Sequence, residues 1–218
     1  VIASNTSAIP ISELQLMVKR PQRFLGIHWA EPSYLTRFLE ITCGSHTDPE
    51  VAERIFSWST CWGKEPTLLK KDIRGFITNR LMYAMYREAF HLVEKYGISF
   101  DTIDKICRYD AGAWMTLMGV FRRMDYLGLE NYSHFLQALF PLLSNSEEVP
   151  VVMQDLISRR ARGTQSQDGL YAYDAASARF FEEAFAQFNE DIYRLAARYP
   201  NQQFISPAGN LTPATYDE

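Results

Sequence analysis

The chain has 218 residues, of which 47% are hydrophobic and 22% are charged, an ordinary composition for a soluble globular protein. The formal net charge is −4 and the Lys and Arg residues are dispersed, which argues against a nucleic-acid-binding surface. No apolar run reaches the roughly 20 residues that a membrane-spanning helix needs. We therefore expect a cytoplasmic protein with no nucleic-acid or membrane partner.

The cysteines give no sign of a metal site. Cys43, Cys61 and Cys107 are odd in number and share no metal-ligand spacing. We expect them to be reduced thiols in or near the core. The sequence has no HExxH and no paired CxxC, so it predicts no bound metal.

The first 71 residues alternate strand and helix patterns. Strands are predicted near residues 1–3, 24–28, 37–41 and 67–69, with helices near 12–19 and from a cap at Thr47 or Asp48 to Gly63. The apolar start at Val1 resembles the middle of a buried strand, so we expect the sequence to begin inside a larger protein. The alternation favours the last part of an α/β domain.

From Asp72 onward the patterns are helical, so residues 72–200 are predicted to form a mainly α-helical domain. A long helix begins near Ile77 and ends at Gly97. Asp174 is expected to cap the final helix, and residues 201–218 are predicted to be an irregular tail. Further helices are predicted at 101–108, 115–125, 131–143, 151–160 and 175–198.

Four polar positions could carry chemistry. His28 ends a predicted strand, where ligands bind in open α/β sheets, and a histidine there can act as a general base near neutral pH. Glu40 in the next strand could fix the imidazole tautomer. The residues alone leave alternatives open: His28 could be structural, residues 4–7 a self-bonded turn, and Asn79 a helix cap.

An ordered set of motifs resembles the 3-hydroxyacyl-CoA dehydrogenase family. The match runs from Ser4 to about Glu94 and continues more weakly beyond it. The motifs are Ser4-Asn5-Thr6-Ser7, Arg20-Pro21-Gln22-Arg23-Phe24-Leu25-Gly26-Ile27-His28, Leu39-Glu40-Ile41, Gly63-Lys64-x-Pro66 and Lys71-Asp72-x-x-Gly75-Phe76-Ile77-x-Asn79-Arg80-Leu81.

The resemblance implies a Rossmann-type NAD-binding domain followed by a helical domain that forms a homodimer. It implies NAD-dependent oxidation of an L-3-hydroxyacyl-CoA to the 3-ketoacyl-CoA, with His28 as the catalytic base and Glu40 bonded to its far nitrogen. Ser7 and Asn79 match substrate-contacting residues, and Ser7 also lies near the nicotinamide in the family. Glu31 stands where the family has an asparagine on the nicotinamide side.

Two departures keep other functions open. Residues 113–121 and Pro32-Ser33-Tyr34 are closer to the carnitine dehydrogenase and lambda-crystallin-like branch, which oxidises free 3-hydroxy acids. The carboxylate of a free acid would need a cation, for which the candidates are Arg37, Arg74, Arg122 and Arg123.

A non-catalytic dimerisation module is the third alternative. The sequence contains no GxGxxG motif, so we expect this chain alone to be inactive and to bind NAD no more tightly than about millimolar. Its apolar helix stripes exceed what one small bundle can bury, which favours a homodimer.

Overall fold

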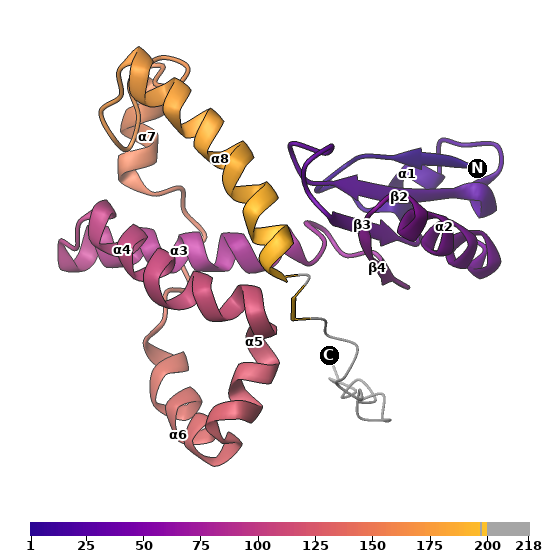
Figure 1. Cartoon of the computed structure of the whole chain (residues 1–218), viewed down its shortest axis with the longest axis horizontal. Helices are drawn as coiled ribbons and strands as arrows, with labels where there is room; N and C mark the ends of the chain where they lie inside the picture. The colour runs from indigo at the N-terminus through magenta and orange to yellow at the C-terminus, as the bar shows by residue number, and fades with distance from the viewer. Residues whose placement is uncertain (197, 200–218) are drawn as a thin grey trace.

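The computed structural model describes residues 1–196, 198 and 199, so the tail predicted at 201–218 lies outside the described residues. The first part is a four-stranded sheet with two helices, and the second part is helical (Figure 1), as the sequence predicts. The sheet has the order β1-β2-β3-β4. Its elements are β1 (Ile2–Ser4), α1 (Ile11–Gln15), β2 (Phe24–Trp29), β3 (Phe38–Thr42), α2 (Pro49–Cys61) and β4 (Glu65–Leu69).

The strand register decides which side chains share a face. β1 runs parallel to β2, β2 antiparallel to β3, and β3 parallel to β4. His28 lies directly opposite Glu40, so both side chains project from the same face of the sheet. Ile27 and Ile41, one position along, pair on the other face.

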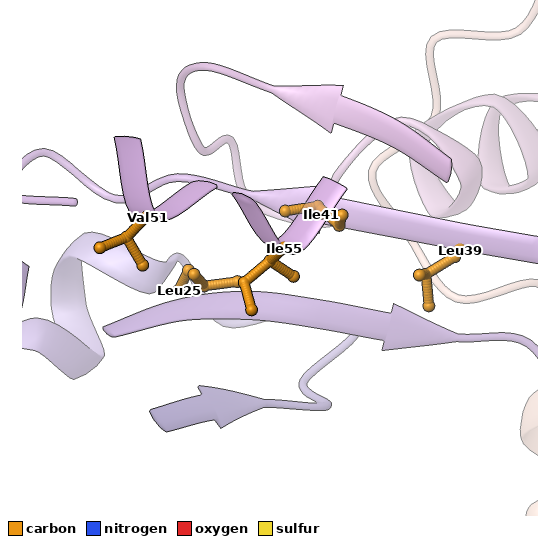
Figure 2. Packing of buried hydrophobic residues seen from close by; sticks show 5 residues of the cluster. All are labelled: Leu25, Leu39, Ile41, Val51 and Ile55. Atoms are coloured by element: carbon orange, nitrogen blue, oxygen red, sulfur yellow. The ribbon is translucent and has the colours of Figure 1, made fainter. Parts of the chain in front are cut away.

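The α2 face of the sheet carries the larger core. Val51 and Ile55 of α2 pack against Leu25, Leu39 and Ile41 of the strands (Figure 2). The helix begins at Asp48, whose side chain accepts the N–H of Glu50, and Gly63 follows its end with φ +72°, as predicted.

Trp58 of α2 and Trp62 just after it follow Val51 and Ile55 at helical spacing but are not buried with them, since they are 52% and 45% exposed. The buried stripe of the helix continues through Ser59 instead, which leaves both indoles at its edge. The expectation of a near-core thiol also fails for Cys61, which is exposed at the end of α2, whereas Cys43 is buried.

The other face packs on the short helix α1. Ile11 is fully buried against this face, and a side chain at position 26 would come within 2.8 Å of its Cδ1 atom, so Gly26 permits the approach. The helix ends at Gln15, earlier than predicted, and Met17, beyond its end, is 76% exposed. Gln15, the last residue of the helix, is buried as well, and its amide donates to the carbonyls of Pro21 and Phe24. These bonds offset the cost of burying an amide.

The first strand is not buried as predicted. β1 lies at the edge of the sheet, and Val1 and Ile2 are 50% and 65% exposed. In this chain β1 has a neighbour, β2, on one side only, and this leaves its apolar side chains exposed.

The helical part begins with a long helix that leads away from the sheet (Figure 1). A π-helical turn, Cys107–Ala111, joins the second and third helices, and Gly97 ends the first with φ +67°. The third and fourth helices begin earlier than predicted. The helices are α3 (Thr78–Tyr96), α4 (Phe100–Ile106), α5 (Gly112–Leu127), α6 (Leu129–Leu139), α7 (Val151–Ser158) and α8 (Ala175–Ala196).

These helices spread apart rather than closing into one bundle (Figure 1). From α3 to α8, Leu156 is the only buried hydrophobic residue among those that the structure describes. The last helix, α8, returns to the sheet, where the Tyr193 hydroxyl accepts the N–H of Arg37 at 2.8 Å. None of the described helices is both long and apolar enough to cross a membrane.

Candidate active site

The structure brings His28 and Glu40 together. His28 Nδ1 lies 3.1 Å from Glu40 Oε2, and the two side chains are 12% and 2% exposed. A carboxylate only accepts hydrogen bonds, so Nδ1 carries the proton and the neutral ring keeps its lone pair on Nε2. The pair therefore presents one nitrogen that can accept a proton.

Two phenyl rings and one backbone amide complete the surroundings of the pair. The rings of Phe38 and Phe76 meet the imidazole edge-on, with centroids 5.5 and 5.9 Å from its centre. The N–H of Ile77 donates to Glu40 Oε1 at 3.2 Å. Both carboxylate oxygens are thus bonded, which a buried charge requires.

The sequence predicted no role for the Phe76 side chain or for the Ile77 amide in this site. Phe76 has φ +50°, which a bulky residue rarely adopts, and it follows Gly75 with φ +80°. This turn directs the next N–H toward Glu40 while the Phe76 side chain stays fully buried. Only the glycine could have been expected from the sequence, because glycine adopts positive φ readily.

The alternative in which Asn79 caps the long helix is wrong. The helix begins at Thr78 with Ile77 in the cap position, and no side chain caps it. The Asn79 side chain instead donates to the backbone carbonyl of Ser7 at 2.6 Å. Asn79 is therefore brought to the loop after β1, next to the other predicted substrate-contacting residue.

The loop after β1 also contacts the end of β2. Asn5 Oδ1 accepts the N–H of Trp29 at 3.0 Å, a contact that the sequence did not suggest. Ser7 is exposed beyond it, and Glu31 is exposed just after β2, ahead of a cis bond to Pro32. Because β1 and β2 are parallel, Ser7, His28 and Glu31 all belong to the edge where α/β sheets bind ligands.

Hydrogen bonds, together with the backbone from Ile77 to Asn79, link four of the five predicted site residues. His28 contacts Glu40, Glu40 contacts Ile77, and two residues later Asn79 contacts Ser7. Glu31 lies outside this network. In the part of the chain that the structure describes, no group of three or more His, Cys, Asp or Glu side chains could hold a metal ion.

Comparison with known families identifies the chain. Residues 1–73 match the NAD binding domain of 3-hydroxyacyl-CoA dehydrogenase, and residues 75–173 match its C-terminal domain. Matches of this kind define a class of NAD-dependent oxidoreductases. The chain belongs to the 3-hydroxyacyl-CoA dehydrogenase family, which includes related 3-hydroxy acid dehydrogenases.

Two curated relatives act on different compounds. The 5-formyl-3-hydroxy-2-methylpyridine 4-carboxylate 5-dehydrogenase of Mesorhizobium japonicum is 32% identical over 173 residues, which is 79% of this chain and 56% of the relative. The L-carnitine dehydrogenase of Burkholderia mallei is 30% identical over 203 residues, which is 91% of this chain and 63% of that relative. The chain thus spans less than two thirds of the length of either relative.

Solved structures agree with this family. The crystal structure of the same type of pyridine-carboxylate dehydrogenase, an NAD+-dependent dismutase, superposes with a TM-score of 0.88 at 28% identity, covering 92% of this chain and 65% of that one. The (S)-3-hydroxybutyryl-CoA dehydrogenase of Ralstonia eutropha gives a TM-score of 0.60 at 25% identity, and the match covers 80% of this chain and 60% of that one.

Proposed function

We propose that, in the full-length protein, this chain carries the proton-transfer site of an NAD-dependent dehydrogenase that oxidises a hydroxyl group. The observation that carries the proposal is the buried His28–Glu40 pair, joined through Ile77 to the segment that brings Asn79 to Ser7. This arrangement supplies a base, a group that fixes its tautomer, and polar side chains beside it.

In the proposed reaction, His28 Nε2 accepts the proton of the substrate hydroxyl while a hydride leaves the same carbon. The C–O bond becomes a carbonyl, and the imidazole becomes a cation. Glu40 stabilises that cation through its bond to Nδ1. Asn79 and Ser7 orient the substrate oxygens.

NAD, when bound, supplies the hydride acceptor. The described residues fit its nicotinamide end, because Ser7 and Glu31 offer a hydroxyl and a carboxylate at the edge formed by the ends of β1 and β2. A carboxylate accepts hydrogen bonds, which suits the amide NH2 of the nicotinamide. We assign both residues to the cofactor side of the site.

For the substrate, we propose a free 3-hydroxy acid in preference to a CoA ester. The support is that the curated relatives described above are named for carnitine and for a pyridine carboxylate, both small carboxylates. The family description supports the second candidate, an L-3-hydroxyacyl-CoA. Both candidates use the same base and the same hydride transfer.

The partner proposed for the helical part is a second copy of the chain. The support is that large apolar side chains stay exposed on α3, α5, α6 and α8. A surface of this kind in an α-helical domain is typical of an isologous homodimer interface.

The test is a His28→Asn variant of the full-length protein, because asparagine can still bond Glu40 but cannot accept a proton. NADH formation is measured by absorbance with L-carnitine, L-gulonate and 3-hydroxybutyryl-CoA. We expect kcat/KM to fall about 10²- to 10⁴-fold for whichever compound the unsubstituted protein oxidises.

His46→Asn is the matched control, since His46 is exposed in the same domain and lies outside the hydrogen-bond network of the site. Turnover of the CoA ester alone would refute the free-acid assignment. Full activity of His28→Asn would refute the assigned base. A protein that forms no NADH with any NAD-linked hydroxy substrate would favour a non-catalytic dimerisation module.

A further inference from the structure

Lys64, just before β4, holds a position that the reaction described above does not use. Its ammonium group donates to the backbone carbonyls of Ser33 and Thr36. It also lies 5.3 Å from the ring centre of Trp29, the residue after His28, and Trp29 in turn stacks on Trp62. One side chain therefore contacts both the end of β2 and the connection that follows it.

These contacts occupy the ammonium group. A lysine has three N–H donors and no acceptor, and here two donors are bonded to carbonyls while an indole face lies beside the group. Burial lowers the pKa of Lys64, which is the expected direction for an ammonium group partly removed from water. Because two of its N–H donors are taken up by backbone carbonyls, the ammonium group is suited to holding that backbone in place.

The segment that Lys64 holds, residues 30–37, is the connection between the strand of the base and the strand of its carboxylate. Within it, the Thr36 hydroxyl donates to the carbonyl of Ala30 at 3.1 Å. At its end, the N–H of Arg37 donates to Tyr193 of α8. It is preceded by His28 and Trp29, and followed by Phe38, whose ring meets the imidazole.

A displacement of residues 30–37 would therefore move site residues at both ends of the segment. At one end it would move His28 and at the other Phe38, while Glu31 lies inside it. The bond between Asn79 and Ser7 is separate from this connection, because Asn79 lies at the start of α3.

We propose that Lys64 is a positioning residue: by holding residues 30–37 through the carbonyls of Ser33 and Thr36, it keeps His28 aligned with Glu40 and Glu31 placed at the cofactor edge. The inference rests on the proposed dehydrogenase function. It assigns Lys64 no contact with substrate or cofactor.

The test compares Lys64→Met, which keeps the length of the side chain without its charge, with Lys64→Arg, which keeps the charge. Lys70→Met is the control, because Lys70 is exposed immediately after β4. In the full-length protein, we expect Lys64→Met to lower kcat about 10- to 100-fold, since small displacements of reacting groups have effects of this size. The KM for the hydroxy substrate should change little, and Lys64→Arg should recover most of the lost kcat.

A second readout does not depend on activity. Hydrogen–deuterium exchange of peptides covering residues 30–37 should accelerate in Lys64→Met but not in Lys70→Met, while the β2–β3 ladder stays protected. Lys64→Gln, which is neutral but can donate to one carbonyl, replaces Lys64→Met if the latter does not fold.

A drop in thermal midpoint with kcat equal to that of Lys70→Met would overturn the positioning role. Unchanged exchange of residues 30–37 would also overturn it. Full activity of His28→Asn would instead overturn the proposed function, and accelerated exchange in Lys64→Met would still support the anchor. The two failures can thus be told apart.

Discussion

Glu40 is the residue on which the site depends most. Its side chain is almost fully buried, and its two oxygens are divided between the ring of His28 and the N–H of Ile77. A buried carboxylate is stable only when it is paired and hydrogen-bonded. The same contacts hold the imidazole in the tautomer that leaves Nε2 free to accept a proton.

Glu40→Gln separates the charge of this residue from its shape. The amide fits the same space and can still accept the Ile77 N–H, but it cannot stabilise an imidazole cation by charge. We expect kcat to fall about 10²- to 10⁴-fold, as when the acidic partner of other histidine bases is replaced by its amide. Steady-state kinetics of the full-length protein, with circular dichroism to verify folding, would measure this effect.

Glu53→Gln is the control for that substitution, because Glu53 is exposed in the middle of α2. It should leave kcat unchanged. A Glu40→Gln enzyme with the activity of Glu53→Gln would mean that the charge of Glu40 does not assist His28.

At the level of elements, the linker between β4 and α3 joins the two parts of the chain through the site. Asp72 accepts the N–H and hydroxyl of Ser12, and the N–H of Gly75 donates to Ala8. The next contacts are those of Ile77 with Glu40 and Asn79 with Ser7. One stretch of chain, from the linker into the first residues of α3, therefore contacts both the loop after β1 and the buried carboxylate of Glu40.

The sequence predicted the elements better than it predicted these contacts. Strands and helices follow local periodicity, and the opposed positions of His28 and Glu40 follow from two short strands joined by a short connection. The Ile77 and Asn79 bonds depend on the positive φ of Phe76, for which the local sequence gives no signal. Likewise, the burial of Gln15 depends on carbonyls that come together only in the folded chain.

The start of α8 allows a test of pH dependence. Asp174 accepts the N–H of Ser177 at 2.7 Å, as predicted for a cap, and the bonds from Ser177 lower the pKa of Asp174. A lowered pKa means that folding favours the carboxylate. The cap therefore stabilises α8 at pH values above the ordinary aspartate pKa of about 3.9 and is lost as pH falls through the lower pKa of the folded state.

We expect Asp174→Asn to remove this dependence, because a neutral amide oxygen accepts the same bond at any pH. Far-ultraviolet circular dichroism between pH 6 and pH 2 should show a smaller helical loss in Asp174→Asn than in the unsubstituted protein. Asp174→Ala should lack the cap at every pH. Equal acid-induced losses in the unsubstituted protein and in Asp174→Asn would contradict the assignment.

Across the whole molecule, the two parts bury apolar surface very differently. The sheet and its two helices have two buried clusters, whereas Leu156 is the one buried hydrophobic residue described from α3 to α8. Phe181, Phe185 and Phe188 of α8 are 56%, 52% and 60% exposed. Helices that expose aromatic stripes of this size lack enough internal packing to hold their arrangement alone.

A second copy of the chain would cover such surface, and the last prediction tests this. We expect the full-length protein to be a dimer at micromolar concentration, with the α8 stripe of Phe181, Phe185 and Phe188 in the interface.

Phe185→Glu would place a charge in that interface and should weaken association by about 2 kcal/mol or more, roughly 30-fold in the dissociation constant. Gln187→Glu is the matched control, because it adds the same charge at an exposed polar position of α8. Sedimentation equilibrium would measure both constants. A monomer at micromolar concentration would refute the dimer, and equal constants for the two variants would remove the α8 stripe from its interface.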